Sequence, residues 1–186
     1  MENTIEIFLH GAGRPQVVEG RPAETLRNLL GRCGALPEAG QMVFVGESDD
    51  AIRNPDAEAD AHEPADIEMT LEVLELLRHR HVHTRAHHRI EVIVRYNGEH
   101  KRRFSPAAPI AVVTAWAKKR FGIDPTTGAD LILVLLPGKT QPRPDEHLSE
   151  LLRPGQHVLE FDLVAEVKPQ GWNLHADLGR TAPTRG

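Results

Sequence analysis

Cys33 is the one side chain of this 186-residue sequence that could act as a thiol nucleophile. A reactive thiol needs an exposed position beside a base or a hydrogen-bond donor. Leu26, Leu29 and Leu30 precede Cys33 at helical spacing, which puts the cysteine on the apolar face of a helix. We therefore expect Cys33 to pack in a core rather than to react. A single cysteine also excludes an intramolecular disulfide and fits a reducing compartment.

An acidic tract has oxygen ligands of the kind that calcium prefers. Asp56, Glu58, Asp60 and His62 occupy every second position. The glycine and the distant bidentate glutamate of an EF-hand loop are missing, so we assign no metal here. The surrounding segment, residues 46–66, is rich in acids and has two prolines and no helical period. We expect it to be a long, solvated, mobile loop.

A second tract, residues 78–89, is rich in histidine and arginine and could bind zinc through imidazoles. Its histidines are His79, His81, His83, His87 and His88. Four interspersed arginines would repel a dication, and the tract itself holds no acidic or thiolate ligand; these arginines are Arg78, Arg80, Arg85 and Arg89. We therefore expect a solvated or strand-edge linker. A pH-sensing role below about pH 6.5 is a hypothesis for these histidines.

The last two residues, Arg185 and Gly186, follow a polar segment for which we predict no stable structure, and we expect residues 168–186 to form a flexible tail. A terminal carboxylate on such a tail can be threaded into a narrow site, and glycine passes where a Cβ would clash. The chain carries no serine or cysteine triad, phosphate loop or paired-carboxylate signature. The residues themselves therefore offer a deliverable terminal carboxylate at Gly186 and no recognised catalytic signature.

Composition favours an ordinary globular protein, with 40% hydrophobic and 26% charged residues. The net charge of −5 combines an acidic first part, residues 1–77, with a basic second part, residues 78–186. Nucleic-acid binding is not expected, because only 4% of residues are aromatic and no dense basic patch is visible. No apolar run of about 18 residues and no charged-then-apolar leader is present, which predicts a cytoplasmic protein without membrane contact.

Strand and helix patterns place these residues on a repeated layout. In the first half we predict strands at residues 5–10, 16–19, 42–45 and 71–76, and a helix opened by Pro22 and closed by Gly34. In the second half Asn97-Gly98 predicts a hairpin between strands at 90–96 and 101–104. A helix from Pro109 to Gly122, an apolar strand at 131–136, a short apolar step at Leu148 and a strand at 158–161 follow. The outer face of the sheet around 131–136 should be apolar enough to need covering by the tail or by a partner.

This order resembles that of ubiquitin-like β-grasp domains, and the prolines and glycines that bound the two helices recur at nearly constant spacing. We therefore predict an α+β fold with two tandem ubiquitin-like domains. The expected bounds are 1–77 for the first domain, 78–89 for a linker, 90–167 for the second domain and 168–186 for the tail. The chain as a whole is similar to bacterial tandem ubiquitin-like modifiers of antiphage systems, which are likened to the interferon-induced tandem modifier of vertebrates.

The resemblance implies partners, a reaction at the Gly186 carboxylate, and a protein that is not itself an enzyme. The Gly186 carboxylate would be activated with ATP by an E1-like enzyme, passed as a thioester to an E2-like enzyme and transferred to a target amine, for which a phage structural protein is one candidate. Arg185 would contribute to recognition of the tail, and a protease would reverse the conjugation. ATP belongs to the activating enzyme, so no cofactor is expected on this chain. Two alternatives are a non-conjugated adaptor and a sulfur carrier that uses a terminal thiocarboxylate.

Overall fold

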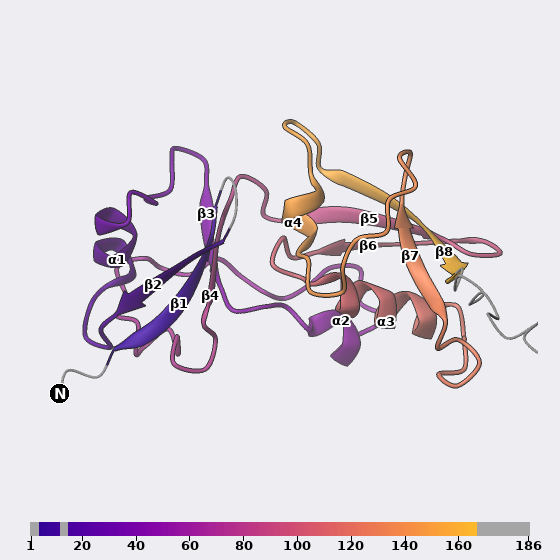
Figure 1. Ribbon diagram of the computed structural model, residues 1–186, viewed down its shortest axis with the longest axis horizontal. Helices are drawn as coiled ribbons and strands as arrows, with labels where there is room; N and C mark the ends of the chain where they lie inside the picture. Colours follow the sequence, from indigo (N-terminus) through magenta and orange to yellow (C-terminus); the bar gives the residue numbers. More distant parts are fainter. Residues whose placement is uncertain (1–3, 12–14, 167–186) are drawn as a thin grey trace, which may run out of the picture.

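The computed structural model describes residues 4–11 and 15–166, and each half of the chain folds around a four-stranded mixed sheet (Figure 1). The first sheet contains β1 (Ile5–His10), β2 (Gln16–Gly20), β3 (Met42–Val45) and β4 (His81–Arg85). Its order is β2-β1-β4-β3, with β1 and β4 parallel and the outer pairs antiparallel. This is the β-grasp arrangement, in which the first and last strands pair at the centre.

The helix α1 (Leu26–Arg32) covers one face of the first sheet. It begins after Thr25, whose hydroxyl accepts a hydrogen bond from the Asn28 N–H at 3.2 Å, as a capping side chain should. It ends before Gly34, whose φ of 65° lies in the left-handed region. Most buried side chains of this core come from α1 and from alternate residues of β1, and Cys33 packs against the core as predicted.

The second sheet repeats this arrangement in the order β6-β5-β8-β7. The elements of the second domain are β5 (Ile90–Arg95), β6 (Glu99–Phe104), α3 (Ile110–Arg120), β7 (Leu131–Leu135), α4 (Leu148–Leu151) and β8 (Val158–Ala165). Asn97 and Gly98 form the predicted turn, both with positive φ. Trp116 of α3 and Phe104 of β6 pack edge to face, 5.2 Å between ring centroids, in the second core. The prediction of two β-grasp units in an α+β fold is confirmed.

The last strand of the first sheet is not where the sequence places it. Residues 71–76 form turns, with Glu75 at a φ of 54°, although they alternate apolar and acidic residues. Leu71 and Leu76 are buried from these turns, so the apolar residues serve the core without a strand. The central strand is β4, which lies inside the segment predicted to be a linker. The linker prediction is therefore wrong for residues 81–85, because polar side chains on this strand are buried on its second face.

The acidic segment, residues 46–66, is not a free loop. It contains the short helix α2 (Asp50–Arg53), which lies beside α3 of the second domain (Figure 1). Ala51 of α2 is part of the second core. The Asp60 N–H donates to the Arg103 carbonyl at 2.9 Å, and the Arg103 N–H donates to the Glu58 carbonyl at 2.9 Å, so the segment adds a short parallel bridge to the edge of β6. The prediction of a solvated, mobile loop is wrong because these backbone groups pair with the second sheet.

Within residues 4–11 and 15–166, no helix has both the length and the apolar character needed to span a membrane.

Candidate functional site

Arg185 and Gly186, the predicted conjugation residues, lie outside the described residues. The structure places the strand that leads toward them. β8 is central in the second sheet, where it pairs parallel with β5 and antiparallel with β7. The Glu166 N–H donates to the Asp130 carbonyl at 2.7 Å just after β8 ends. The chain is therefore anchored on both sides up to the point where the described residues stop.

The outer face of the second sheet is mixed rather than wholly apolar. Ile132 of β7 faces Val164 of β8 across the antiparallel pair, and Val164 is 38% exposed. Arg95 and Glu160 form an ion pair of 2.6 Å on neighbouring strands of the same face. The remaining apolar residues of β7 point toward the core or are half-buried. The face predicted to be apolar thus combines a small apolar patch with charged residues.

The acidic segment ties the two domains together through a buried cation. Arg102 of β6 has no exposed side-chain surface and donates to Asp60 Oδ1 at 2.9 Å and to Asp50 Oδ2 at 2.8 Å. Its Nη1 donates to the carbonyl of Asn54 at 2.7 Å. Trp116 of α3 adds a hydrogen bond from its indole N–H to the Pro55 carbonyl at 3.0 Å. Asp56, Asp60 and His62 therefore bind separate partners instead of converging on one point.

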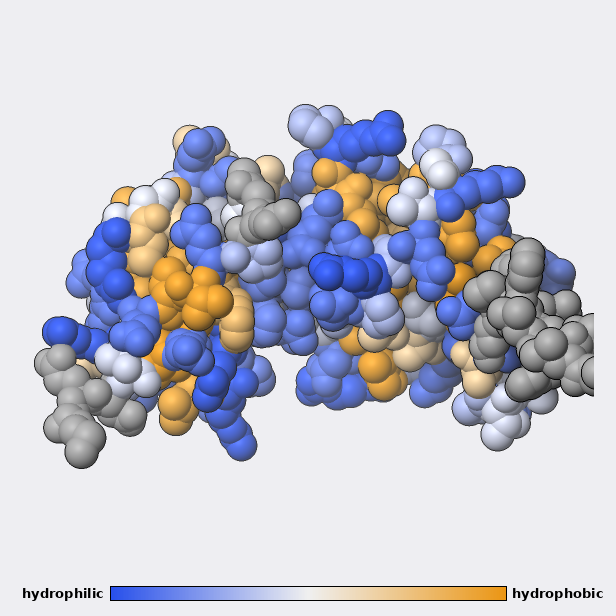
Figure 2. Space-filling model, viewed as in Figure 1, coloured by the Kyte–Doolittle hydropathy of each residue, from blue (hydrophilic) through white to orange (hydrophobic). Residues whose placement is uncertain are grey.

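The first sheet is covered on both of its faces, and this explains the polar residues of β4. Its second face, opposite α1, carries His10, Phe44 and His83, which are all buried. The junction with the second domain lies against this face (Figure 1). Figure 2 shows hydrophilic residues along this junction and hydrophobic surface gathered over each domain. On this face of the first sheet the buried side chains are therefore imidazole and aromatic rings rather than aliphatic groups.

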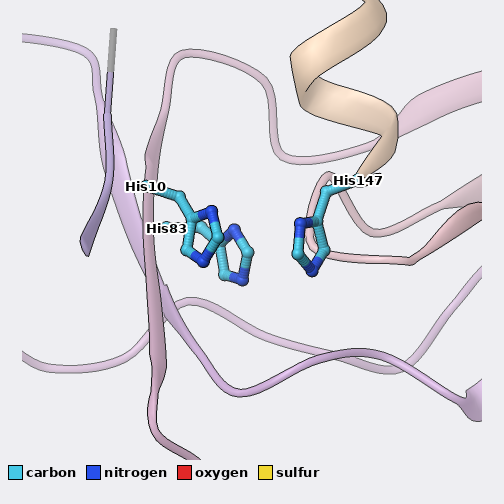
Figure 3. A group of neighbouring side chains, drawn as sticks. All are labelled: His10, His83 and His147. Carbon is cyan, nitrogen blue, oxygen red and sulfur yellow. The ribbon is translucent and has the colours of Figure 1, made fainter. Parts of the chain in front are cut away.

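Four histidines, His10, His81, His83 and His147, form a cluster at this junction, and we call them the histidine cluster. His10 and His83 are Cα partners in the parallel pairing of β1 with β4, and their rings stack at 4.4 Å between centroids. His147, which precedes α4 in the second domain, approaches from the other side at 4.5 Å from the His83 ring centroid (Figure 3). His10, His83 and His147 are 6%, 0% and 2% exposed.

Two carboxylates flank the histidine cluster. The Glu150 Oε1 atom lies 3.1 Å from His10 Nδ1 and 3.5 Å from His147 Nδ1. Glu47 accepts a hydrogen bond from His147 Nε2 at 2.7 Å. Glu150 also accepts from the His147 N–H at 3.3 Å, which fixes the start of α4. Glu150 therefore links the second domain to His10 of the first domain, and Glu47 links the first domain to His147 of the second domain.

The charge state within the cluster is uneven. Burial opposes protonation of His147, but the neighbouring Glu150 and Glu47 outweigh it and raise the pKa of His147 to about 9. Burial, followed by the nearby His10 and His147, holds the pKa of His83 well below its ordinary value. At neutral pH His147 is accordingly cationic between two carboxylates, while His83 is neutral.

The pattern of the sequence missed this cluster because its members come from three distant segments. Only His81 and His83 belong to the tract that was considered for zinc, and the acidic groups come from outside that tract. The signal that could have found the cluster was the β-grasp topology itself, since a parallel pairing of the first and last strands aligns His10 with His83. The linker prediction for residues 78–89 hides this pairing, because it assigns no strand to His81–Arg85.

Comparison with known families concerns the second domain. Residues 91–166 match the family described as BilA ubiquitin-like domain 2. No curated protein sequence matches the chain. The matched residues begin in β5 and run just past the end of β8, so they cover the whole second sheet. Through this domain the chain is similar to the BilA ubiquitin-like proteins. This similarity supports the interpretation of the chain as a ubiquitin-like protein of a bacterial antiphage (Bil) system.

Proposed function

We propose that this chain is a ubiquitin-like modifier of a bacterial antiphage system and is joined to target amines through the Gly186 carboxylate. The observation that carries the proposal is the match of residues 91–166 to BilA ubiquitin-like domain 2. The fold agrees with this role, because β8 ends a β-grasp domain and leads toward the segment that contains Arg185 and Gly186. Arg185 is the proposed recognition residue of that segment.

The proposed reaction is an acyl transfer in four steps. A Gly186 carboxylate oxygen attacks the α-phosphate of ATP on the E1-like enzyme, and pyrophosphate leaves. A cysteine thiolate of that enzyme displaces AMP, and exchange with a cysteine of the E2-like enzyme moves the thioester. A target amine then attacks the carbonyl, the thiolate leaves, and an amide forms; a protease that hydrolyses this amide reverses the reaction.

This chain supplies the acyl group and a docking surface but none of the catalytic side chains. Cys33, its only thiol, packs against the core of the first domain. We assign enzyme docking to the outer face of the second sheet, where Val164 is exposed beside the charged pair of Arg95 and Glu160. A face that combines a small apolar patch with flanking charges suits a transient complex that must form and dissociate.

A reconstituted reaction tests the proposal. The full-length protein is incubated with the E1-like and E2-like enzymes encoded beside it and with ATP and magnesium. We expect a band of protein–enzyme conjugate that a thiol reductant removes, and none without ATP. Mass spectrometry of a tryptic digest should place the acyl bond at Gly186.

Two glycine substitutions make the test specific. Gly186→Ala should strongly reduce the conjugate, because the added Cβ enters the narrow activating site. The matched control is Gly11→Ala, where a Cβ meets no atom within 4 Å, and this variant should be conjugated as efficiently as the wild type. A sulfur adduct on Gly186 would instead support a sulfur carrier. Full antiphage activity of the Gly186→Ala variant would support a non-conjugated adaptor.

A further inference from the structure

We propose that His10, His83 and His147 form a binding site for Zn²⁺ at the junction of the two domains. One ring nitrogen of each of these residues lies within 4.8 Å of the ring nitrogens of the other two. His10 and His83 come from the first sheet and His147 from the second domain, so the ion would be held from both sides of the junction (Figure 3).

His83 supplies the strongest reason for a ligand at this point. Its side chain is 0% exposed, and neither ring nitrogen has a hydrogen-bond partner among the described residues. Leaving a buried polar group unsatisfied is costly, and an orphaned pair of imidazole nitrogens calls for a partner that the protein itself does not provide. A metal ion accepts the lone pair of one imidazole nitrogen and would satisfy that nitrogen of His83, for which no neighbouring side chain provides a partner.

The chemistry of the three ligands favours zinc. Imidazole nitrogen is one of the two commonest zinc ligands, and sets of three histidines with an open fourth position are established zinc sites. In a tetrahedral site with Zn–N bonds of about 2.0–2.1 Å, the ligand nitrogens lie about 3.3 Å apart. The ligand nitrogens therefore need to approach by at most about 1.5 Å. The stacked rings of His10 and His83, whose planes differ by 15°, would also have to rotate so that their lone pairs converge on the ion. Water would occupy the fourth position.

The surrounding charges suit a dication. Glu47 and Glu150 together bring two negative charges to the site, and each lies within 3.1 Å of a ring nitrogen of a proposed ligand. Zinc binding would displace the proton that makes His147 a cation, and the two carboxylates would then orient the neutral ligating imidazoles and increase their basicity. Arg85 is the arginine of the tract whose positive charge opposes a further positive charge at His83. The negative charge of Glu150 in turn favours the charged form of Arg85. The repulsion expected from the tract's arginines is thus offset by carboxylates from other segments.

A direct binding experiment tests the site. The full-length protein is stripped with EDTA, dialysed against Zn²⁺ and analysed for metal content, and the affinity is measured by calorimetry. We expect about one equivalent of zinc with a Kd below about 1 μM, and a higher Tm with zinc than in EDTA. With Co²⁺ as the probe, the visible d–d absorption should show coordination by nitrogen ligands.

Single substitutions assign the ligands. His10→Gln, His83→Gln and His147→Gln should each weaken zinc binding at least tenfold, by about the amount that one lost ligand or orienting contact costs. The matched controls are His79→Gln and His88→Gln, from the same tract, whose side chains are 53% and 46% exposed and pair with other acids. Both controls should bind zinc as the wild type does.

Two results would overturn the proposal. One is a wild-type protein that binds Zn²⁺ no more tightly than about 100 μM. The other is unchanged zinc affinity in His10→Gln and His147→Gln, once circular dichroism in EDTA shows that both variants are folded. If His83→Gln fails to fold, these two variants and the Co²⁺ spectrum of the wild type still decide the question. The outcome is independent of conjugation, because the binding assay uses neither ATP nor enzymes.

Discussion

Asp60 and Arg102 form a salt bridge of 2.9 Å, and neither side chain has any exposed surface. Asp60 belongs to the acidic segment of the first half, whereas Arg102 belongs to β6 of the second sheet. Asp60 also accepts hydrogen bonds from the Ser48 hydroxyl at 2.8 Å and from the Ser105 N–H at 3.0 Å. The four groups make a polar core between the two domains, in which each buried charge depends on the other.

Arg102→Met should lower the free energy of unfolding by about 3–5 kcal/mol, because it leaves the Asp60 carboxylate buried without its counter-ion. Urea unfolding followed by circular dichroism measures the change. The matched control is Arg95→Met, since Arg95 also pairs with an acid but is 45% exposed, and its loss should change the urea midpoint far less.

Asp60→Leu combined with Arg102→Met should be more stable than Arg102→Met alone, because the fully buried carboxylate is then removed together with its cation, and only the partly exposed Asp50 loses its partner. Equal urea midpoints for Arg102→Met and Arg95→Met would contradict the role assigned to the buried pair.

Two glycines at the end of α1 should respond to alanine with opposite signs. Gly31 lies inside the helix, and a Cβ there would meet only Leu36 Cδ1 at an ordinary 3.8 Å. Gly31→Ala should therefore stabilise the protein by about 0.5–1 kcal/mol. Gly34 has equally open surroundings but a φ of 65°, so Gly34→Ala should destabilise it by about 1–2 kcal/mol.

The comparison separates backbone conformation from crowding, since neither position lacks space for a methyl group. Thermal and urea unfolding of both variants measure the two changes. A shift of the same sign in both variants would rule out the conformational explanation.

Stability should fall as the pH drops below about 6.5, and His62 should account for part of the loss. Burial lowers the pKa of His62, and Arg89 acts in the same direction, against the opposing effects of the Val45 carbonyl, Asp60 and Glu63. A histidine whose pKa is lower in the folded state binds its proton more readily when unfolded, so the unfolded state gains as the pH falls through this range.

His62→Gln removes the titrating imidazole and should therefore flatten the dependence of the unfolding free energy on pH between about 6.5 and 5. Urea titrations of the wild type and the variant at several pH values provide the measurement. Parallel curves for the two proteins would show that His62 does not titrate differently in the folded and unfolded states.

The sequence predicts the second domain well because its local signals agree with the final structure. Asn97 and Gly98 adopt the positive φ that their turn requires, and Pro109 and Gly122 bound α3 as their types suggest. Leu148 begins α4, which was expected as a short apolar step. These positions depend on backbone conformation within a few residues, so nearby sequence is sufficient to specify them.

The first domain is harder to predict because its last strand is defined by tertiary contacts. The alternation at residues 71–76 imitates a strand, yet Leu71 and Leu76 reach the core from turns. β4 has one core side chain, Val82, and its histidines are buried only because the second domain lies against them. A period-two pattern cannot reveal a polar face whose burial depends on another domain.

The candidate sites show the same division. Arg185 and Gly186 are predicted from residue type and from their place in the sequence, and both lie outside the described residues. The histidine cluster joins residues as far apart as His10 and His147, a distance at which no motif spacing operates. The composition of the acidic segment likewise predicts a solvated loop, because the partner of Asp60 is Arg102 of the second sheet, which lies far away in the sequence.

The coverage of the first sheet by its neighbour makes the two β-grasp units inequivalent in spite of their shared topology. One unit uses the second face of its sheet within the molecule, so an enzyme that binds this face of a β-grasp domain would find it free only on the second unit, the one nearer the proposed conjugation residue Gly186. The two domains would then offer one docking face rather than two. This asymmetry would let the enzymes of the proposed conjugation reaction distinguish the second domain from the first.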